Sequence, residues 1–365
     1  MTLSDLQGKA AGGDIRAQVQ LAARLDQTGR HDDAINWLAT AAKTGDAEAL
    51  TLLGFRLLSG RDCPHLPAQG ASMLVDAARA GGGEAAAFTA MLAGGGFYGP
   101  QNWAVALDQL QNAAEAGWPA ARAQLRILAG GPAPSASAPA EAARADSWRE
   151  LRRNVDVAAW TSAPAPRNLS DSPRVLAVEA LVSPETCDWV IAQSQGRLER
   201  ALVNDPETGL TIMGQTRTNQ AANFALVDTN LVNLFIQARI AAAAQVPIQM
   251  MEAFAVLHYG VGEQASEHFD FLDPLVPAYA AVIAQYGQRV ATCLLYLNDD
   301  YEGGETDFPE LGFSHRGRKG DALIFHSADA SGVPDPRTLH AGRPPTSGEK
   351  WVLSQFIRNR PRAGL

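Results

Sequence analysis

A pattern of small residues recurs in the first third of the chain and limits its fold more than any other feature. Glycine stands just before the start of an alanine-containing segment at Gly13, Gly45, Gly81 and Gly117, so the pattern returns every 32 to 36 residues. Before the last three glycines, large apolar residues at helical spacing lead into an Ala-Ala pair. A glycine there can adopt the left-handed conformation that ends a helix. Repeated helix pairs of this length predict an α-helical solenoid.

The alanines of the pattern fit the same interpretation, because small side chains allow two antiparallel helices to approach closely. Over roughly residues 10–130 the pattern resembles Sel1-like repeats, which are relatives of tetratricopeptide repeats. The resemblance implies a concave surface that recruits a protein or peptide. An alanine-rich helical bundle with accidental self-similarity remains the alternative. We assign residues 1–130 to a Sel1-like helical repeat domain.

A change of composition follows the repeats. Residues 130–146, GGPAPSASAPAEAARAD, contain almost no large apolar side chain and therefore cannot bury a core. We predict a Pro/Ala/Ser-rich linker with a short helix over residues 131–173. From residue 174 a strand leads into a helix start at which Ser183 is the N-cap and Pro184 occupies the first turn.

Composition and charge limit the partners of the chain. The 365 residues carry a net charge of −9, which opposes nonspecific attraction to nucleic acid phosphates. The three cysteines, Cys63, Cys187 and Cys293, lie far apart and form neither a disulfide framework nor a zinc cluster. The N-terminus lacks the pattern of a secretory signal, and no apolar stretch is long enough to cross a bilayer. We expect a cytoplasmic protein without nucleic acid or membrane partners.

Short runs of apolar and β-branched residues mark strands in the C-terminal half. They cover residues 253–259, 289–298, 321–326 and 350–358, with Gly, Pro or Asp clusters at the breaks. Such runs predict an antiparallel sandwich or barrel, and the segment from residue 229 to 244 predicts a helix that packs against one of its sheets.

Three residues of this half have the chemistry of a metal site. His268 and Asp270 are two apart in a strand-like run, so both would point to one face. His340 ends a further strand-like run and supplies a second imidazole. Two histidines and one carboxylate hold non-haem Fe(II) while leaving coordination positions open. Ten residues after His340, Lys350 would supply a cation for the far carboxylate of a 2-oxo acid; an exposed strand-end lysine and a zinc hydrolase site are the alternatives.

The motifs together resemble the Fe(II)/2-oxoglutarate dioxygenases of the prolyl 4-hydroxylase type. They are the HxD at 268–270, GGETDFP at 303–309, GDALIF at 320–325 and the H-x₉-K at 340–350, within a match over about residues 174–360. The resemblance implies a double-stranded β-helix, or jelly-roll, domain with flanking helices over residues 174–365, and so an α+β chain. It assigns Fe(II) to His268, Asp270 and His340, and the distal carboxylate of 2-oxoglutarate to Lys350. It also places three hydroxyl groups in the co-substrate pocket, those of Tyr259, Tyr296 and Thr306. For the two tyrosines, burial as ordinary core residues is the alternative.

The resemblance implies an activity as well. A C–H bond on a peptide or protein side chain is hydroxylated while 2-oxoglutarate is decarboxylated to succinate, with ascorbate as a reductant. The chain departs from the family at Ala265 and Ser266, where an aromatic residue usually precedes the HxD. Residues 271–288 form either a lid or a plain surface connection. The alternative function is a repeat-based interaction scaffold whose oxygenase fold senses oxygen or 2-oxoglutarate with little turnover.

Overall fold

The computed structural model describes residues 2–131, 145–204, 211–212 and 216–361. Most of the predicted Pro/Ala/Ser-rich linker, residues 132–144, therefore lies outside the described part of the chain. Contacts between residues divide the chain into two compact units, Met1–Asp156 with Val227–Leu234, and Val157–Leu226 with Phe235–Leu365. The domain ranges proposed from the sequence stay predictions.

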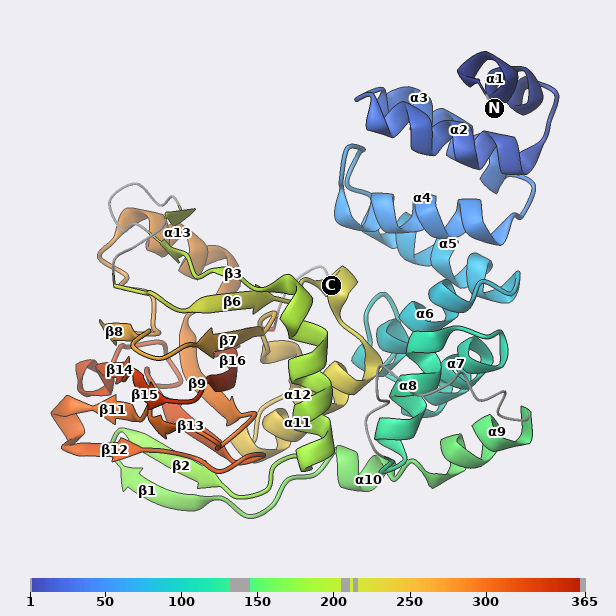
Figure 1. The fold of residues 1–365 in the computed structure, drawn as a ribbon. Coiled ribbons are helices and arrows are strands. Elements are labelled where there is room, and N and C mark those ends of the chain that lie inside the picture. The colour runs from blue at the N-terminus through green and yellow to red at the C-terminus, as the bar shows by residue number, and fades with distance from the viewer. Residues whose placement is uncertain (1, 132–144, 205–210, 213–215, 362–365) are drawn as a thin grey trace. The chain divides into compact units, whose positions relative to one another are not determined.

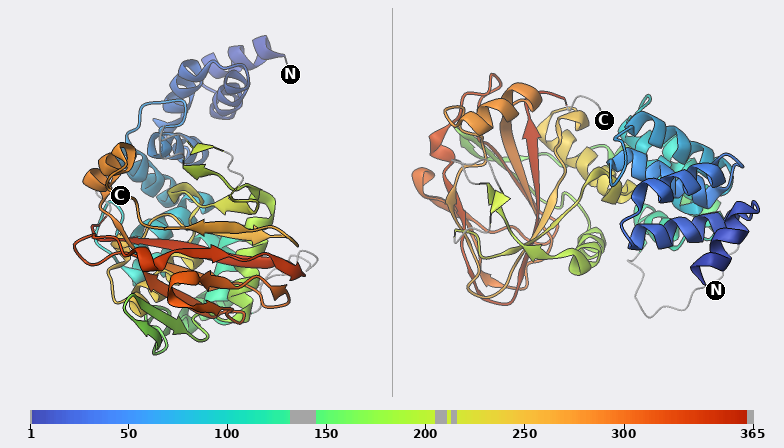
Figure 2. Two further views of the ribbon diagram at one scale, coloured as in Figure 1. Left: turned by 90° about the vertical axis from the view of Figure 1, so that its left-hand side faces the viewer. Right: turned by 90° about the horizontal axis from the view of Figure 1, so that it is seen from above.

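The first unit is a stack of helix pairs, which Figure 1 and the two views of Figure 2 show from three sides. Its helices are α1 Leu3–Ala11, α2 Ile15–Gln27, α3 His31–Ala42, α4 Ala47–Ser59, α5 Pro67–Arg79, α6 Gly83–Gly95, α7 Trp103–Glu115, α8 Pro119–Leu128 and α9 Ala145–Asn154. This arrangement confirms the predicted α-helical solenoid.

Small residues make the stacking possible. The four repeat glycines all have positive φ, between +82° and +93°, and each lies between the two helices where the chain reverses. The first alanine of each Ala-Ala pair, Ala41, Ala77 and Ala113, is completely buried. A Cβ added to Gly70 of α5 would stand 2.5 Å from the carbonyl oxygen of Gly54 in α4. The backbones of α4 and α5 therefore touch through glycine.

The second unit is built on two antiparallel sheets, as the resemblance implied. The larger sheet has the strand order β1-β2-β13-β9-β16-β7-β6-β3, and the smaller has the order β12-β11-β14-β8. The larger sheet contains β1 Arg167–Asp171, β2 Arg174–Val178, β3 Glu199–Arg200, β6 Gln220–Asn223, β7 Ala255–Tyr259, β9 Arg289–Tyr296, β13 Ala322–His326 and β16 Lys350–Arg358. The smaller contains β8 Ala265–His268, β11 Thr306–Phe308, β12 Phe313–His315 and β14 His340–Gly342. Two short ribbons add β4 Val203–Asn204 with β5 Thr211–Ile212, and β10 Glu302–Gly303 with β15 Pro345–Ser347.

Helices flank this unit. They are α10 Val157–Trp160, α11 Pro184–Ser194, the part of α12 Leu231–Ala244 that follows Leu234, and α13 Pro277–Tyr286. Helix α11 begins as predicted, because the Ser183 side chain accepts a hydrogen bond from the backbone N–H of Thr186 at 3.3 Å. Helix α12 contacts the larger sheet, where Gln237 Nε2 donates to Gln355 Oε1 of β16 at 2.8 Å. The segment 271–288 contains α13, none of whose residues is buried, whereas Leu272 and Gln288 near the two ends of the segment are buried.

An aromatic core holds the two sheets together. It contains Phe308 from the smaller sheet and Tyr296, Phe325 and Val352 from the larger sheet, all at most 2% exposed. This core fixes the strands that carry the metal-site residues. None of the helices in the described part of the chain combines the length and the apolar character needed to cross a membrane.

Candidate metal centre

Strand pairing brings the two histidines together. In the smaller sheet β14 pairs with β8 so that His340 lies directly opposite His268, and the ring centroids are 4.3 Å apart. The position of Asp270 differs from the prediction, which placed His268 and Asp270 on one strand. Strand β8 ends at His268, and Asp270 lies in a bend two residues later. Phe269, between them, is 40% exposed. The strand therefore carries only one of the two residues, and the bend delivers the other to the same point.

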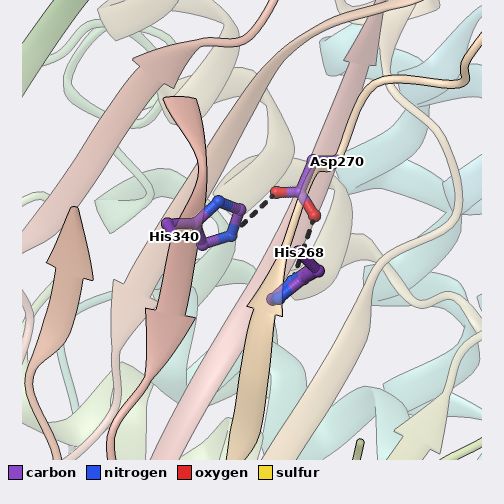
Figure 3. A group of neighbouring side chains, drawn as sticks. All are labelled: His268, Asp270 and His340. Carbon is purple, nitrogen blue, oxygen red and sulfur yellow. Dashed lines mark ion pairs between the residues drawn. The ribbon is translucent and has the colours of Figure 1, made fainter. Parts of the chain in front are cut away.

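The three side chains converge on one point (Figure 3). Asp270 Oδ1 is 3.5 Å from His268 Nε2, and Asp270 Oδ2 is 3.5 Å from His340 Nε2. Each residue offers one ligand atom, and these atoms all lie within 4.8 Å of one another. Ligands about 2.1 Å from a metal in an octahedral arrangement stand about 3 Å apart. The triad therefore fits a single small divalent cation.

Hydrogen bonds fix which ring nitrogens face that point. His268 Nδ1 is 2.8 Å from the carbonyl oxygen of Ser266, and His340 Nδ1 is 3.0 Å from the carbonyl oxygen of Thr338. A carbonyl oxygen can only accept, so both Nδ1 atoms carry the hydrogen and both Nε2 atoms keep a lone pair. This is the usual orientation of metal-ligating histidines.

The electrostatics of the centre favour the metal-binding protonation states. Burial raises the pKa of Asp270. The nearby His340 and His268 and the hydrogen bond from Thr292 outweigh burial and hold this pKa well below its ordinary range. Burial lowers the pKa of His340 to about 4, although the Asp270 charge acts in the opposite direction. At neutral pH the centre therefore offers a charged carboxylate and a neutral imidazole.

Two residues at the centre escaped the sequence analysis. Thr292 of β9 is fully buried and donates its hydroxyl hydrogen to Asp270 Oδ2 at 2.7 Å. Arg217 Nη2 donates to His268 Nε2 at 3.0 Å. A threonine in a strand and an arginine in a polar stretch are ordinary residues, so no signal in the sequence marks them.

Lys350 is deeply buried. Only 2% of it is exposed, and its Nζ donates to the carbonyl oxygen of Gly304 at 2.7 Å, over the rings of Tyr259 at 5.2 Å and Tyr296 at 5.9 Å. Within the described residues no carboxylate forms an ion pair with it. Burial lowers the pKa of Lys350 to about 8, with Glu305 acting in the opposite direction. The alternative of an exposed strand-end lysine is therefore wrong.

The triad and Lys350 share one cavity. Tyr259 and Thr306, two of the three residues predicted to line the co-substrate pocket, line this cavity. Tyr296, the third, does not line the cavity, but its hydroxyl lies 3.0 Å from Thr306 Oγ1. The cavity is lined by Arg217, Leu257, Tyr259, Ala265, His268, Asp270, Leu294, Thr306, His340, Gly342, Lys350, Val352 and Ser354.

The fold and this triad define a non-haem iron oxygenase, and comparisons with known proteins agree. Residues 254–358 match the family described as the 2OG-Fe(II) oxygenase superfamily. Prolyl 4-hydroxylase 1 of Arabidopsis thaliana is 34% identical over 209 residues, which are 53% of this chain and 72% of that protein. The chain belongs to the 2OG-Fe(II) oxygenase superfamily, with a prolyl 4-hydroxylase-like C-terminal domain. Its cofactors are Fe(II), held by the His-Asp-His triad, and 2-oxoglutarate.

Solved structures resemble each half of the chain. A viral collagen prolyl hydroxylase from Paramecium bursaria Chlorella virus 1, in complex with 2-oxoglutarate, has 26% identity and a TM-score of 0.40, and the match covers 50% of this chain and 95% of that one. A Sel1 repeat protein from Oxalobacter formigenes has 29% identity and a TM-score of 0.32, over 34% of this chain and 97% of that one.

Proposed function

We propose that the chain hydroxylates a C–H bond of a prolyl residue in a peptide or protein, and that 2-oxoglutarate is converted to succinate in the same turnover. The observation that carries the proposal is Lys350, a buried cation without a carboxylate partner among the described residues, in the cavity that holds the metal triad. An unpaired buried charge is costly, so a site of this kind favours an anionic ligand. A dicarboxylate such as 2-oxoglutarate can reach a metal with one end and Lys350 with the other.

The metal triad and Lys350 have distinct roles in this proposal. His268, Asp270 and His340 hold Fe(II) from one side and leave its other positions open. Bound Fe(II) and 2-oxoglutarate supply, with O₂, the oxidising chemistry that an unactivated C–H bond requires. Lys350 pairs with the distal carboxylate.

Hydroxyl groups complete the co-substrate site in this proposal. Tyr259 and Thr306 donate hydrogen bonds from the cavity wall, and Tyr296 orients the Thr306 hydroxyl from behind. Thr292 keeps the Asp270 carboxylate turned toward the metal. Ascorbate serves as the reductant that keeps the iron in its ferrous state.

The substrate class is inferred from the relatives and from the repeats. Proteins named as prolyl 4-hydroxylases match more than half of the chain, which supports a prolyl target. Ala265 lines the cavity where the family usually has an aromatic residue, so we expect the substrate side to be wider than in the relatives. The Sel1-like helices recruit the protein that carries the target residue. The three free cysteines support a reducing, cytoplasmic location.

Anaerobic titration with Fe(II) and 2-oxoglutarate tests the site, because their complex absorbs visible light by charge transfer. We expect the absorption band in the wild type, no band in Asp270→Ala, and a much higher 2-oxoglutarate requirement in Lys350→Ala. Aerobic incubation with end-blocked prolyl peptides then tests the substrate class, with succinate and the gain of one oxygen atom in the peptide as readouts. The absence of the band under all conditions contradicts the co-substrate site. A normal band with no oxidised peptide and little succinate favours the sensor scaffold instead.

A further inference from the structure

Arg217 is held beside the metal-bearing strand. The backbone of Arg217 forms an antiparallel bridge with Ala265, the first residue of β8, and the backbone N–H of Ser266 donates to the carbonyl oxygen of Thr216 at 2.8 Å. The segment around Arg217 thus extends the smaller sheet beyond its edge strand β8. The side chain opposite it in the bridge is only a methyl group. The long guanidinium side chain therefore has room to reach the centre.

The guanidinium points at the metal-binding face of His268. Its Nη2 donates to Nε2, the ring nitrogen whose lone pair is directed at the metal position. A metal ion on Nε2 uses this lone pair, and Arg217 then needs another acceptor for its N–H groups. Among the described residues no carboxylate forms an ion pair with Arg217. Once that lone pair binds a metal, the half-buried guanidinium has up to five N–H donors and no carboxylate partner within the described residues, which favours a ligand that brings oxygen atoms.

The two cations of the cavity differ in depth and in origin. Lys350 comes from β16 of the larger sheet and is 2% exposed, whereas Arg217 lies beside the edge of the smaller sheet and is half-buried. The deeper cation, Lys350, is the one that the proposed function assigns to the co-substrate. The shallower cation suits a group that enters from solvent.

We propose that Arg217 is a positioning residue for the primary substrate, and this rests on the proposed function. Its N–H groups bind an oxygen acceptor beside the target proline and hold the C–H bond toward the metal. In a peptide this acceptor is an amide carbonyl, and in a free amino acid it is the carboxylate.

The test measures substrate placement without turnover. The protein is loaded anaerobically with Mn(II) and 2-oxoglutarate, and the paramagnetic relaxation of probe protons is followed by NMR. The probes are an end-blocked Ala-Pro-Ala peptide and free L-proline. The variants are Arg217→Gln, Arg217→Lys and, as a control that removes one exposed arginine charge elsewhere in the same unit, Arg318→Gln. Binding of 2-oxoglutarate to each variant is titrated in parallel.

We expect the wild type and Arg318→Gln to relax the peptide protons equally. Arg217→Gln should bind the peptide roughly ten- to a hundredfold more weakly, the usual effect of losing hydrogen bonds from a charged donor. Arg217→Lys should recover part of the affinity, and 2-oxoglutarate affinity should stay within about twofold in all variants. If the metal instead relaxes the protons of free L-proline and not those of the peptide, and Arg217→Gln weakens L-proline binding to the same extent, the assignment is supported, with a carboxylate as the acceptor.

Three results would overturn the assignment. If the wild type oxidises the peptide and Arg217→Gln binds it with equal affinity, the role of Arg217 is refuted while the proposed function stands. A selective loss of 2-oxoglutarate affinity in Arg217→Gln shows that the guanidinium serves the co-substrate instead. If the wild type relaxes neither probe and oxidises neither, the assignment falls together with the proposed substrate class, while a normal charge-transfer band keeps the oxygenase site itself intact.

Discussion

Replacing Lys350 by methionine should stabilise the ligand-free protein while it weakens 2-oxoglutarate binding. Burial lowers the pKa of Lys350 from its ordinary value of 10.5 to about 8, which corresponds to an unfavourable contribution of about 3 kcal/mol at neutral pH. Methionine has a similar length and removes this cost. The lost hydrogen bond to the Gly304 carbonyl offsets about 1–2 kcal/mol of the gain. The net expectation is about 1–2 kcal/mol of added stability.

The same substitution removes the partner of the distal carboxylate. Leaving one charge of a buried pair without its partner costs about 3–5 kcal/mol, so the dissociation constant of 2-oxoglutarate should rise roughly 150-fold or more. Chemical denaturation without ligand measures the first effect, and titration of the charge-transfer band measures the second. Lys319→Met is the control, because Lys319 pairs with Asp188 outside the cavity and should leave 2-oxoglutarate affinity unchanged.

The opposite signs make the reasoning easy to refute. A Lys350→Met protein that is less stable than the wild type and binds 2-oxoglutarate normally would show that Lys350 is a structural residue. A protein that loses both stability and affinity would show that the ammonium is already well compensated without a ligand.

Three further predictions follow from single contacts. Lys350 loses its charge above pH 8 in the ligand-free protein, so 2-oxoglutarate affinity should fall about tenfold per pH unit above pH 8. The stability of the ligand-free protein should rise between pH 8 and 10.5, because over that range the unfolded chain binds this proton and the folded chain does not. Thr292→Val removes the hydroxyl that donates to Asp270 and should weaken Mn(II) binding about ten- to a hundredfold in a metal titration, whereas Thr292→Ser should bind normally. Gly70→Ala should destabilise the repeat unit by about 1–3 kcal/mol in denaturant unfolding, while Gly8→Ala, whose added Cβ meets no atom within 4 Å, should not destabilise it; equal effects of the two would contradict the close approach of α4 and α5.

Local patterns predicted much of the fold. The four strand-like runs match β7, β9, β13 and β16 to within a few residues, and β16 matches fully. The repeat glycines have the positive φ that their place in the pattern predicted. These features depend on neighbouring residues and on regular periods, which a sequence displays directly.

The metal centre was predictable where its chemistry is unusual. Two histidines and a carboxylate at this spacing, in one chain with a distant lysine, form a combination that few other functions need. The predicted position of Asp270 was wrong, because the sequence placed it on the same strand as His268 and that strand ends at His268. A strand end depends on its pairing partner, and β14 is only three residues long.

The sequence by itself determined the solenoid, the strands of the oxygenase domain and the identity of the triad, since each rests on residue types and spacings within one segment. Only the tertiary structure decided the depth of Lys350, the support of Asp270 by Thr292 and the approach of Arg217 to His268. The last two contacts join residues 22 and 51 positions apart. Burial, pKa and hydrogen bonding at such positions depend on which strands pack around them, and the register that sets this is a property of the whole sheet.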